Sequence, residues 1–223
     1  MKIPVYNASW FEHISALFFP EQCICCHAEG ALLCTHCLEE IIPLKKTSRI
    51  KPEGIQTINK LYTPCHYHKN PVLQKALHYF KYRYLKKIGY YLAPLLYRAL
   101  SKEELPHTTH IVPIPLHKKR KTFRGFNQSL VLATHLSSYF NFPVTPILKR
   151  VKKTISQATL SREQRIDNLI NAFDLCHDNP PPRTTPLLLV DDVCTTLSTF
   201  KSAAETLQKH GYKIILCTAL AQA

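Results

Sequence analysis

The second half of the chain constrains the fold most strongly, because short apolar segments alternate there with segments of helical periodicity. Three apolar runs predict strands, at residues 111–115, 187–190 and 213–219. The predicted helices lie at residues 125–140, 162–173 and 197–210, and Gly211 ends the last of them. Strands that alternate with helices predict an α/β fold with a parallel sheet covered by helices on both faces.

The first part of the chain has a different composition. Residues 1–44 hold five of the nine cysteines and show little periodicity, whereas residues 45–105 are rich in Tyr, Lys and Arg. At 223 residues the chain has room for one medium domain with a small appendage. We therefore expect a cysteine-rich region at residues 1–60 and an α/β domain at residues 61–223.

No apolar run is long enough to predict a membrane span. The longest one, residues 90–100, is interrupted by Pro94 and Arg98. The first apolar segment contains Glu12 and His13 and no small-residue cleavage pattern, so we expect no signal peptide and a cytoplasmic location. Cysteines in a cytoplasmic chain indicate metal binding rather than disulfides.

Positive charge is concentrated in the middle of the chain. The formal net charge is +14, and between residues 41 and 160 there are 22 lysines and arginines against three acids. Such an excess suggests a polyanionic partner, either nucleic acid or a phosphorylated small molecule. Solvated helix faces that aid solubility are the alternative interpretation.

Four cysteines have the spacing of a structural zinc site. They form two Cys-x2-Cys pairs separated by seven residues: Cys23, Cys26, Cys34 and Cys37. Each pair can hold one side of a tetrahedral Zn²⁺ ion, which would replace a hydrophobic core in so short a segment. Three nearby residues are alternative ligands: Cys25, His27 and His36.

Two adjacent carboxylates, Asp191 and Asp192, end the strand predicted at residues 187–190, and small hydroxylated residues then open a helix. The carboxyl ends of parallel strands are where ligands bind in such folds. The acids can accept from sugar hydroxyls or hold a metal, and the amides at a helix N-terminus can bind a phosphate. This segment predicts a ligand that carries both groups.

A basic loop is expected directly after the first strand, at the same edge of the sheet. Its cations could neutralise a pyrophosphate: His117, Lys118, Lys119, Arg120, Lys121 and Arg124. Gly125 would allow close backbone approach, while Asn127 and Gln128 could cap a helix or contact a ligand. An exposed basic turn is the alternative.

A third polar segment precedes Ala172 and Phe173. It contains Lys152, Lys153, Gln157, Arg162, Arg165 and Asn168. The last three would lie along one helix face, where they could close over the site as a lid or face water.

The segment V-D-D-V-C-T-T-L-S-T resembles the loop of type I phosphoribosyltransferases that binds phosphoribosyl diphosphate (PRPP), with Leu197 in place of a glycine. Three other matches are Phe19-Pro20 before the cysteines, V-P-I-P-L-H followed by R-G-F-N-Q, and the Q-x-x-L-x-x-x-x-R-x-x-N series from Gln157. Together they resemble the ComF family (competence protein F). The resemblance implies a zinc ribbon fused to a type I phosphoribosyltransferase fold, and a role in the uptake of transforming DNA.

The resemblance also implies the positions of the subsites. The pyrophosphate loop maps to residues 116–119, and the ribose and Mg²⁺ region to Asp191 and Asp192. The phosphate loop maps to Val193, Cys194, Thr195, Thr196, Leu197, Ser198 and Thr199. Because leucine adopts positive φ poorly and blocks close approach, we expect looser phosphate binding than a glycine would allow.

Three functions remain open at this stage. The first is a phosphoribosyltransferase, and the second is a module for single-stranded DNA that uses residues 78–87 (HYFKYRYLKK). An amphipathic helix with Tyr79 and Phe80 packed inward is the alternative for that segment. The third is a scaffold that docks proteins of the DNA-uptake machinery. We expect a ComF-type protein that binds PRPP and acts on single-stranded DNA.

Overall fold

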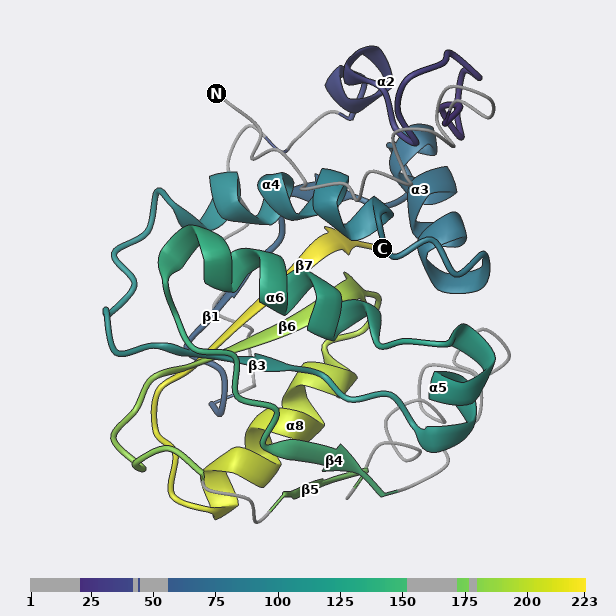
Figure 1. Ribbon diagram of the computed structural model, residues 1–223. Helices are drawn as coiled ribbons and strands as arrows, with labels where there is room; N and C mark the ends of the chain where they lie inside the picture. The colour runs from purple at the N-terminus through teal and green to yellow at the C-terminus, as the bar shows by residue number, and fades with distance from the viewer. Residues whose placement is uncertain (1–20, 42–43, 45–55, 152–171, 177–179) are drawn as a thin grey trace.

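The computed structural model describes residues 21–41, 44, 56–151, 172–176 and 180–223. Its centre is a parallel sheet whose strands lie in the order β1 (Lys60–Tyr62), β7 (Ile215–Gln222), β6 (Leu187–Cys194) and β3 (His110–Pro113). A short strand, β2 (Cys65–His66), continues the β1 edge along β7. The parallel sheet expected from the sequence is confirmed (Figure 1).

Helices cover both faces of this sheet. One face carries three helices: α3 (Pro71–Tyr82), α4 (Ile88–Leu100) and α6 (Gln128–Phe140). The other face carries α8 (Ser198–Lys209) and a small antiparallel pair, β4 (Leu148–Arg150) and β5 (Phe173–Leu175). The fold is therefore a mixed α/β architecture with a mainly parallel sheet flanked by helices.

Strand β6 shows why the sequence pattern predicts this arrangement. Leu188 and Val190 belong to the core under α4 and α6, while Leu187 and Leu189 belong to the core under α8. All four are fully buried. Successive residues of a strand point to opposite faces, so a strand covered on both sides reads as an uninterrupted apolar run.

Two segments differ from the sequence expectation. Strand β6 continues through Cys194, so the two acids lie within the strand rather than after it. The expected basic loop is a short helix, α5 (Lys118–Arg124), because the His117 side chain accepts from the Lys119 N–H at its start and Gly125 ends it with a φ of +72°.

The third polar segment falls almost wholly outside the described residues. This applies to Lys152, Lys153, Gln157, Arg162, Arg165 and Asn168. The end of the helix expected at residues 162–173 is wrong, since Phe173 begins strand β5.

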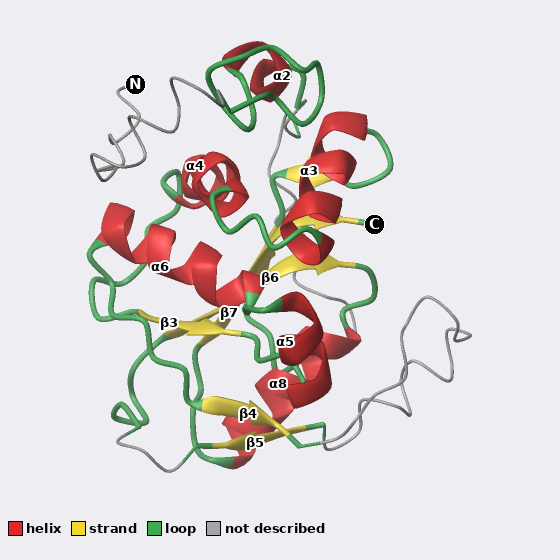
Figure 2. Ribbon diagram, turned by 45° about the vertical axis from the view of Figure 1, so that its right-hand side comes forward, coloured by secondary structure: helices red, strands yellow, loops and turns green. Residues whose placement is uncertain are grey.

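The cysteine-rich region packs on the α/β domain beside α3 and α4 (Figure 2). Its buried Ile24 and Leu33 share one core with Leu73 and Leu77 of α3. The Lys87 ammonium also lies 2.9 Å from a Glu21 carboxylate oxygen. The two regions therefore share apolar packing, while a domain boundary at residue 60 stays a prediction. Within the described part of the chain, no helix is both long and apolar enough to cross a membrane.

Candidate functional site

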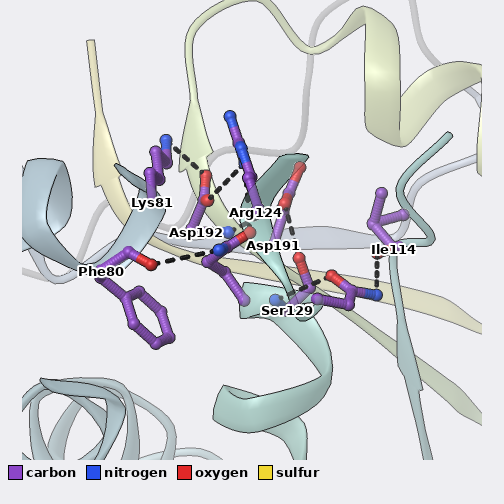
Figure 3. A network of polar contacts seen from close by, with 9 residues as sticks. Phe80, Lys81, Ile114, Arg124, Ser129, Asp191 and Asp192 are labelled. Atoms are coloured by element: carbon purple, nitrogen blue, oxygen red, sulfur yellow. Dashed lines mark hydrogen bonds and ion pairs between the residues drawn. The ribbon is translucent and has the colours of Figure 1, made fainter. Parts of the chain in front are cut away.

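The two acids lie at the carboxyl end of β6 and point into a polar network (Figure 3). Both acids reach helices on the same face of the sheet, because α3 and α6 lie on one side of it. Asp192 turns toward α3 and α5, and Asp191 toward the start of α6. The pair therefore occupies the edge of the sheet where the sequence places a ligand.

Asp192 is held by two cations. One of its carboxylate oxygens lies 2.9 Å from Lys81 Nζ, and the other lies 4.0 Å from Arg124 Nη1. The Asp192 side chain is only 10% exposed, and a carboxylate at that depth needs opposite charges nearby. Lys81 is a site residue that the sequence did not single out for this role, although it lies in the aromatic and basic run of residues 78–87.

Asp191 has hydrogen-bond donors rather than a close cation. Its Oδ1 accepts from Ser129 Oγ and from the Asp192 backbone N–H, each at 2.9 Å. Burial and the charge of Asp192 raise the pKa of Asp191 to about 6, although both hydrogen bonds oppose the shift. Asp191 can therefore exchange a proton near neutral pH, which suits contact with a hydroxyl group.

The R-G-F-N-Q motif positions this network. Asn127 Oδ1 caps α6 by accepting from the Ser129 N–H, and its Nδ2 donates to the Ile114 carbonyl at the end of β3. Gln128 is buried, accepts from Arg124 Nη1 and donates to the Phe80 carbonyl of α3. The capping role expected for Asn127 is confirmed. The contacts of Gln128 indicate a positioning role.

Two further guanidinium groups affect the site electrostatically. Burial, together with Arg124, lowers the pKa of Arg120 on α5. Burial and Arg120 lower the pKa of Arg150 on β4 to about 10, while the charge of Asp191 acts in the opposite direction. Arginines that repel each other electrostatically in this way are stabilised by an anion bound beside them. Nothing in the sequence pattern marked Arg150, because β4 reaches the site only through the tertiary fold.

The lysines and the histidine of the basic segment do not contact the acids. Lys118, Lys119 and Lys121 are exposed on α5, so they add positive potential at the surface rather than contacts with the acids. His117 caps the same helix. The structure thus brings Arg120 and Arg124 toward the acids and leaves the lysines in water.

The hydroxyl-rich segment connects β6 to α8. Thr196 Oγ1 and Ser198 Oγ are 2.6 Å apart, and Thr195 is exposed. Leu197 precedes α8 with a φ of −54°, a right-handed conformation, and packs its half-buried side chain against the core under α8. The left-handed conformation that would strain a leucine does not occur here. Leu197 also provides no side-chain cap, which leaves the helix N-terminus suited to an anion.

The cysteine cluster is the other candidate site. The Sγ atoms of Cys23, Cys26, Cys34 and Cys37 all lie within 4.8 Å of one another. Thiolates that share a tetrahedral Zn²⁺ ion are about 3.8 Å apart, so the four side chains can hold a metal with little movement. Cys34 also caps the short helix α2 (Thr35–Glu39) through its Sγ. Among the described residues, none of the alternative ligands joins this group: Cys25, His27 and His36.

Comparison with known proteins places the chain among relatives named for DNA utilization and competence. A stretch of 195 residues, 85% of this chain, is 30% identical to the DNA utilization protein YhgH of Salmonella typhimurium and covers 78% of it. Competence protein F of Haemophilus influenzae is 38% identical over 137 residues, 59% of this chain. The chain belongs to the ComF family. The resemblance stated from the sequence motifs is thereby confirmed.

Other ComF relatives match less of the chain. Competence protein ComFC of Bacillus subtilis is 29% identical over 101 residues, covering 45% of this chain and 39% of that protein. The chain spans 60% of the length of the Haemophilus influenzae ComF relative. No family model matches the chain.

Proposed function

We propose that this protein acts in the uptake and processing of single-stranded DNA during natural transformation. We further propose that it binds PRPP or a related phosphoribosyl ligand at Asp191 and Asp192. Relatives named for competence and DNA utilization support the first part. The observation that carries the second part is the convergence of the acid pair, the arginines of α5 and the uncapped start of α8 at one edge of the sheet.

In this proposal each part of the ligand meets a different group. Asp191 takes the ribose hydroxyls, and the N–H groups at the start of α8 take the 5′-phosphate. Arg120, Arg124 and Arg150 attract the diphosphate. Asp192 is already neutralised by Lys81, so Mg²⁺ would arrive with the diphosphate, whose charge it screens.

A transferase step would use the same groups. The bond between ribose C1 and the diphosphate oxygen breaks, a nucleophile bonds to C1, and the diphosphate leaves with the electron pair. The arginines would stabilise the charge that builds on the departing diphosphate. The proton released by the nucleophile would pass to solvent or to the departing diphosphate.

A second candidate is a binding or scaffold protein that keeps the fold without the transferase activity. The 2.9 Å contact between Lys81 and Asp192 favours it, because this ion pair occupies one of the two acids. In this case the cysteine region would be a docking surface for proteins of the uptake machinery. Release of pyrophosphate in the presence of PRPP and an acceptor separates the two candidates.

Calorimetric titration with PRPP, with and without Mg²⁺, tests the proposed site. We expect saturable binding that is strengthened by Mg²⁺ and lost in Asp191→Asn, which keeps the side-chain shape. The control is Asp174→Asn, because Asp174 pairs with Lys149 on the exposed surface of the β4–β5 pair. Failure of the folded, metal-loaded protein to bind PRPP would overturn the proposed ligand.

Zinc is the metal we propose for the cysteine cluster. Four thiolates without a carboxylate or an open position suit a structural Zn²⁺ ion. The cysteine cluster is separated from the sheet by α3 and α4. Its role would therefore be to order the cysteine-rich region.

A further inference from the structure

The exposed large aromatic side chains of the described residues gather at one place. Tyr82 ends α3, Tyr84 follows it, and Phe123 lies on α5, with exposed fractions of 46%, 60% and 66%. The rings of Tyr82 and Phe123 meet edge-on at 6.5 Å between centroids. We call these three residues the aromatic patch. Single exposed apolar side chains are ordinary on a protein surface, whereas a group drawn from two separate elements indicates a binding surface.

The positions of the aromatic rings are fixed by the backbone conformation and by contacts between the two segments that carry them. Tyr84 has a φ of +57° and Gly125 a φ of +72°, and the Tyr84 ring packs against Gly125. A Cβ atom added to Gly125 would lie 2.8 Å from Cδ1 of the Tyr84 ring, so glycine is what allows this contact. The Tyr84 hydroxyl also donates to the Phe123 carbonyl at 2.8 Å. The rings therefore have defined positions before any ligand arrives.

Positive side chains lie around the aromatic patch. The segments that carry them contain no acidic residues to balance this charge. Residues 60–102 and 105–150 contain no Asp or Glu at all. Exposed cations lie on the segments that carry the rings: Arg83, Lys86, Lys118, Lys119 and Lys121. Rings interleaved with cations fit a single nucleic-acid strand, because the bases can stack while the phosphates are neutralised.

Arg124 connects this surface to the acid pair. Its guanidinium carbon lies 5.3 Å from the centroid of the Tyr82 ring, and its Nη1 lies 4.0 Å from an Asp192 oxygen. A strand stacked on Tyr82 would thus pass beside the acid pair.

We propose that the aromatic patch and its flanking cations bind single-stranded nucleic acid and lead the strand to Asp191 and Asp192. This inference rests on the proposed function and adds the surface that would bring nucleic acid to the phosphoribosyl site.

Fluorescence anisotropy with a labelled oligothymidine strand tests the surface, using the full chain with its metal. Tyr82→Ala/Phe123→Ala should weaken binding roughly tenfold or more, since a base stacked on an aromatic ring is lost at each position. The control, Tyr82→Phe/Phe123→Tyr, keeps both rings and should bind like the parent. The salt dependence of binding should be unchanged in the alanine variant and shallower in Lys118→Gln/Lys119→Gln.

Three outcomes would overturn this inference. They are a parent protein that does not bind the strand, an alanine variant that binds as tightly as the parent, and an equal loss for the ring-retaining control. Binding by the alanine variant would leave the rings as a surface for a protein partner instead. PRPP titration of the same variants distinguishes the two proposals. If PRPP does not bind, the phosphoribosyl site is contradicted, while the result for single-stranded nucleic acid is unaffected.

Discussion

The two candidate sites of this ComF protein are assembled in opposite ways. The four cysteines come from one short span between Cys23 and Cys37, on the turn closed by the antiparallel bridge of Gln22 with Glu29 and on the start of α2. The acid site draws on α3, α5, α6 and β6, from Lys81 to Asp192. A local site can be recognised from spacing alone, whereas a site built from distant elements exists only when the sheet and its helices are packed.

This difference also sets what should happen when each site is damaged. The cysteine region contributes its apolar side chains to a core that it shares with α3 and has no separate core of its own, so loss of its metal should unfold it and expose that core. The acid site rests on a complete sheet, so changes there should alter charge balance and ligand binding while the fold persists.

The largest effect is expected from loss of the metal. Cys37→Ser removes a buried ligand and should abolish stoichiometric zinc and lower the melting temperature by several degrees or more. Metal analysis and calorimetry measure the two effects. Cys25→Ser is the matched control, because Cys25 lies outside the four-cysteine group. Equal zinc loss in both variants would contradict the assigned ligands.

The next effect is expected at the ion pair of the acid site. Lys81→Ala removes the closest cation from the buried Asp192, leaving the guanidinium groups of Arg124 and Arg120, and should lower the free energy of unfolding by ~3 kcal/mol. Urea unfolding measures the change. The control is Lys149→Ala, whose pair with Asp174 is almost half exposed and should contribute under ~1 kcal/mol. Similar losses in the two variants would show that Lys81 is not a buried charge partner.

A smaller effect, with a defined pH dependence, is expected at Asp191. Its pKa in the folded protein is raised to about 6, so the folded state binds this proton more tightly than the unfolded chain does. The charged carboxylate therefore lowers stability as pH rises from about 4 to 6 and keeps it lowered above that range. Asp191→Asn should gain ~2 kcal/mol over the parent at pH 7.

Urea unfolding at several pH values checks this prediction, and the gain should disappear below about pH 4, where the parent also carries a neutral group. Asparagine can still accept the hydrogen bonds from Ser129 and the Asp192 N–H. A variant that is less stable than the parent at every pH would contradict the raised pKa.

The smallest effect concerns Leu197. Leu197→Gly should lower stability by ~1 kcal/mol, because it removes a half-buried side chain and adds backbone freedom. It should also raise PRPP affinity a few-fold, since the backbone could then approach a phosphate more closely. Leu197→Ala separates the two causes, as it shortens the side chain without adding the backbone freedom of glycine. Equal affinity in the parent and the glycine variant would show that leucine does not weaken phosphate binding.

Much of the fold was predictable because its signals are local. The apolar run of β6 marks a strand covered on both faces, and the helical spacing after Asn127 marks α6, although that helix begins three residues later than expected. The inward packing of Phe80 also followed from helical periodicity, and Phe80 is fully buried. The α5 helix was missed because a run of lysines and arginines carries no apolar periodicity to mark it.

The acid site was predictable only in part. Asp191, Asp192 and the arginines of α5 could be named because they lie at the carboxyl ends of strands that share one edge of the sheet. Lys81, Ser129 and Arg150 could not be assigned to it, since their relation to the acids depends on how α3, α6 and β4 pack.

The sequence by itself determined the parallel sheet, the edge at which its acids lie, and the four cysteines. Each of these follows from the period of a strand, the period of a helix or the spacing of one short segment. Only the tertiary structure decided that Asp192 pairs with Lys81, that Asp191 instead has hydrogen-bond donors, and that the exposed rings lie beside Arg124. The physical reason is that burial and charge pairing depend on distances between elements, and those distances arise only when the sheet and its helices pack.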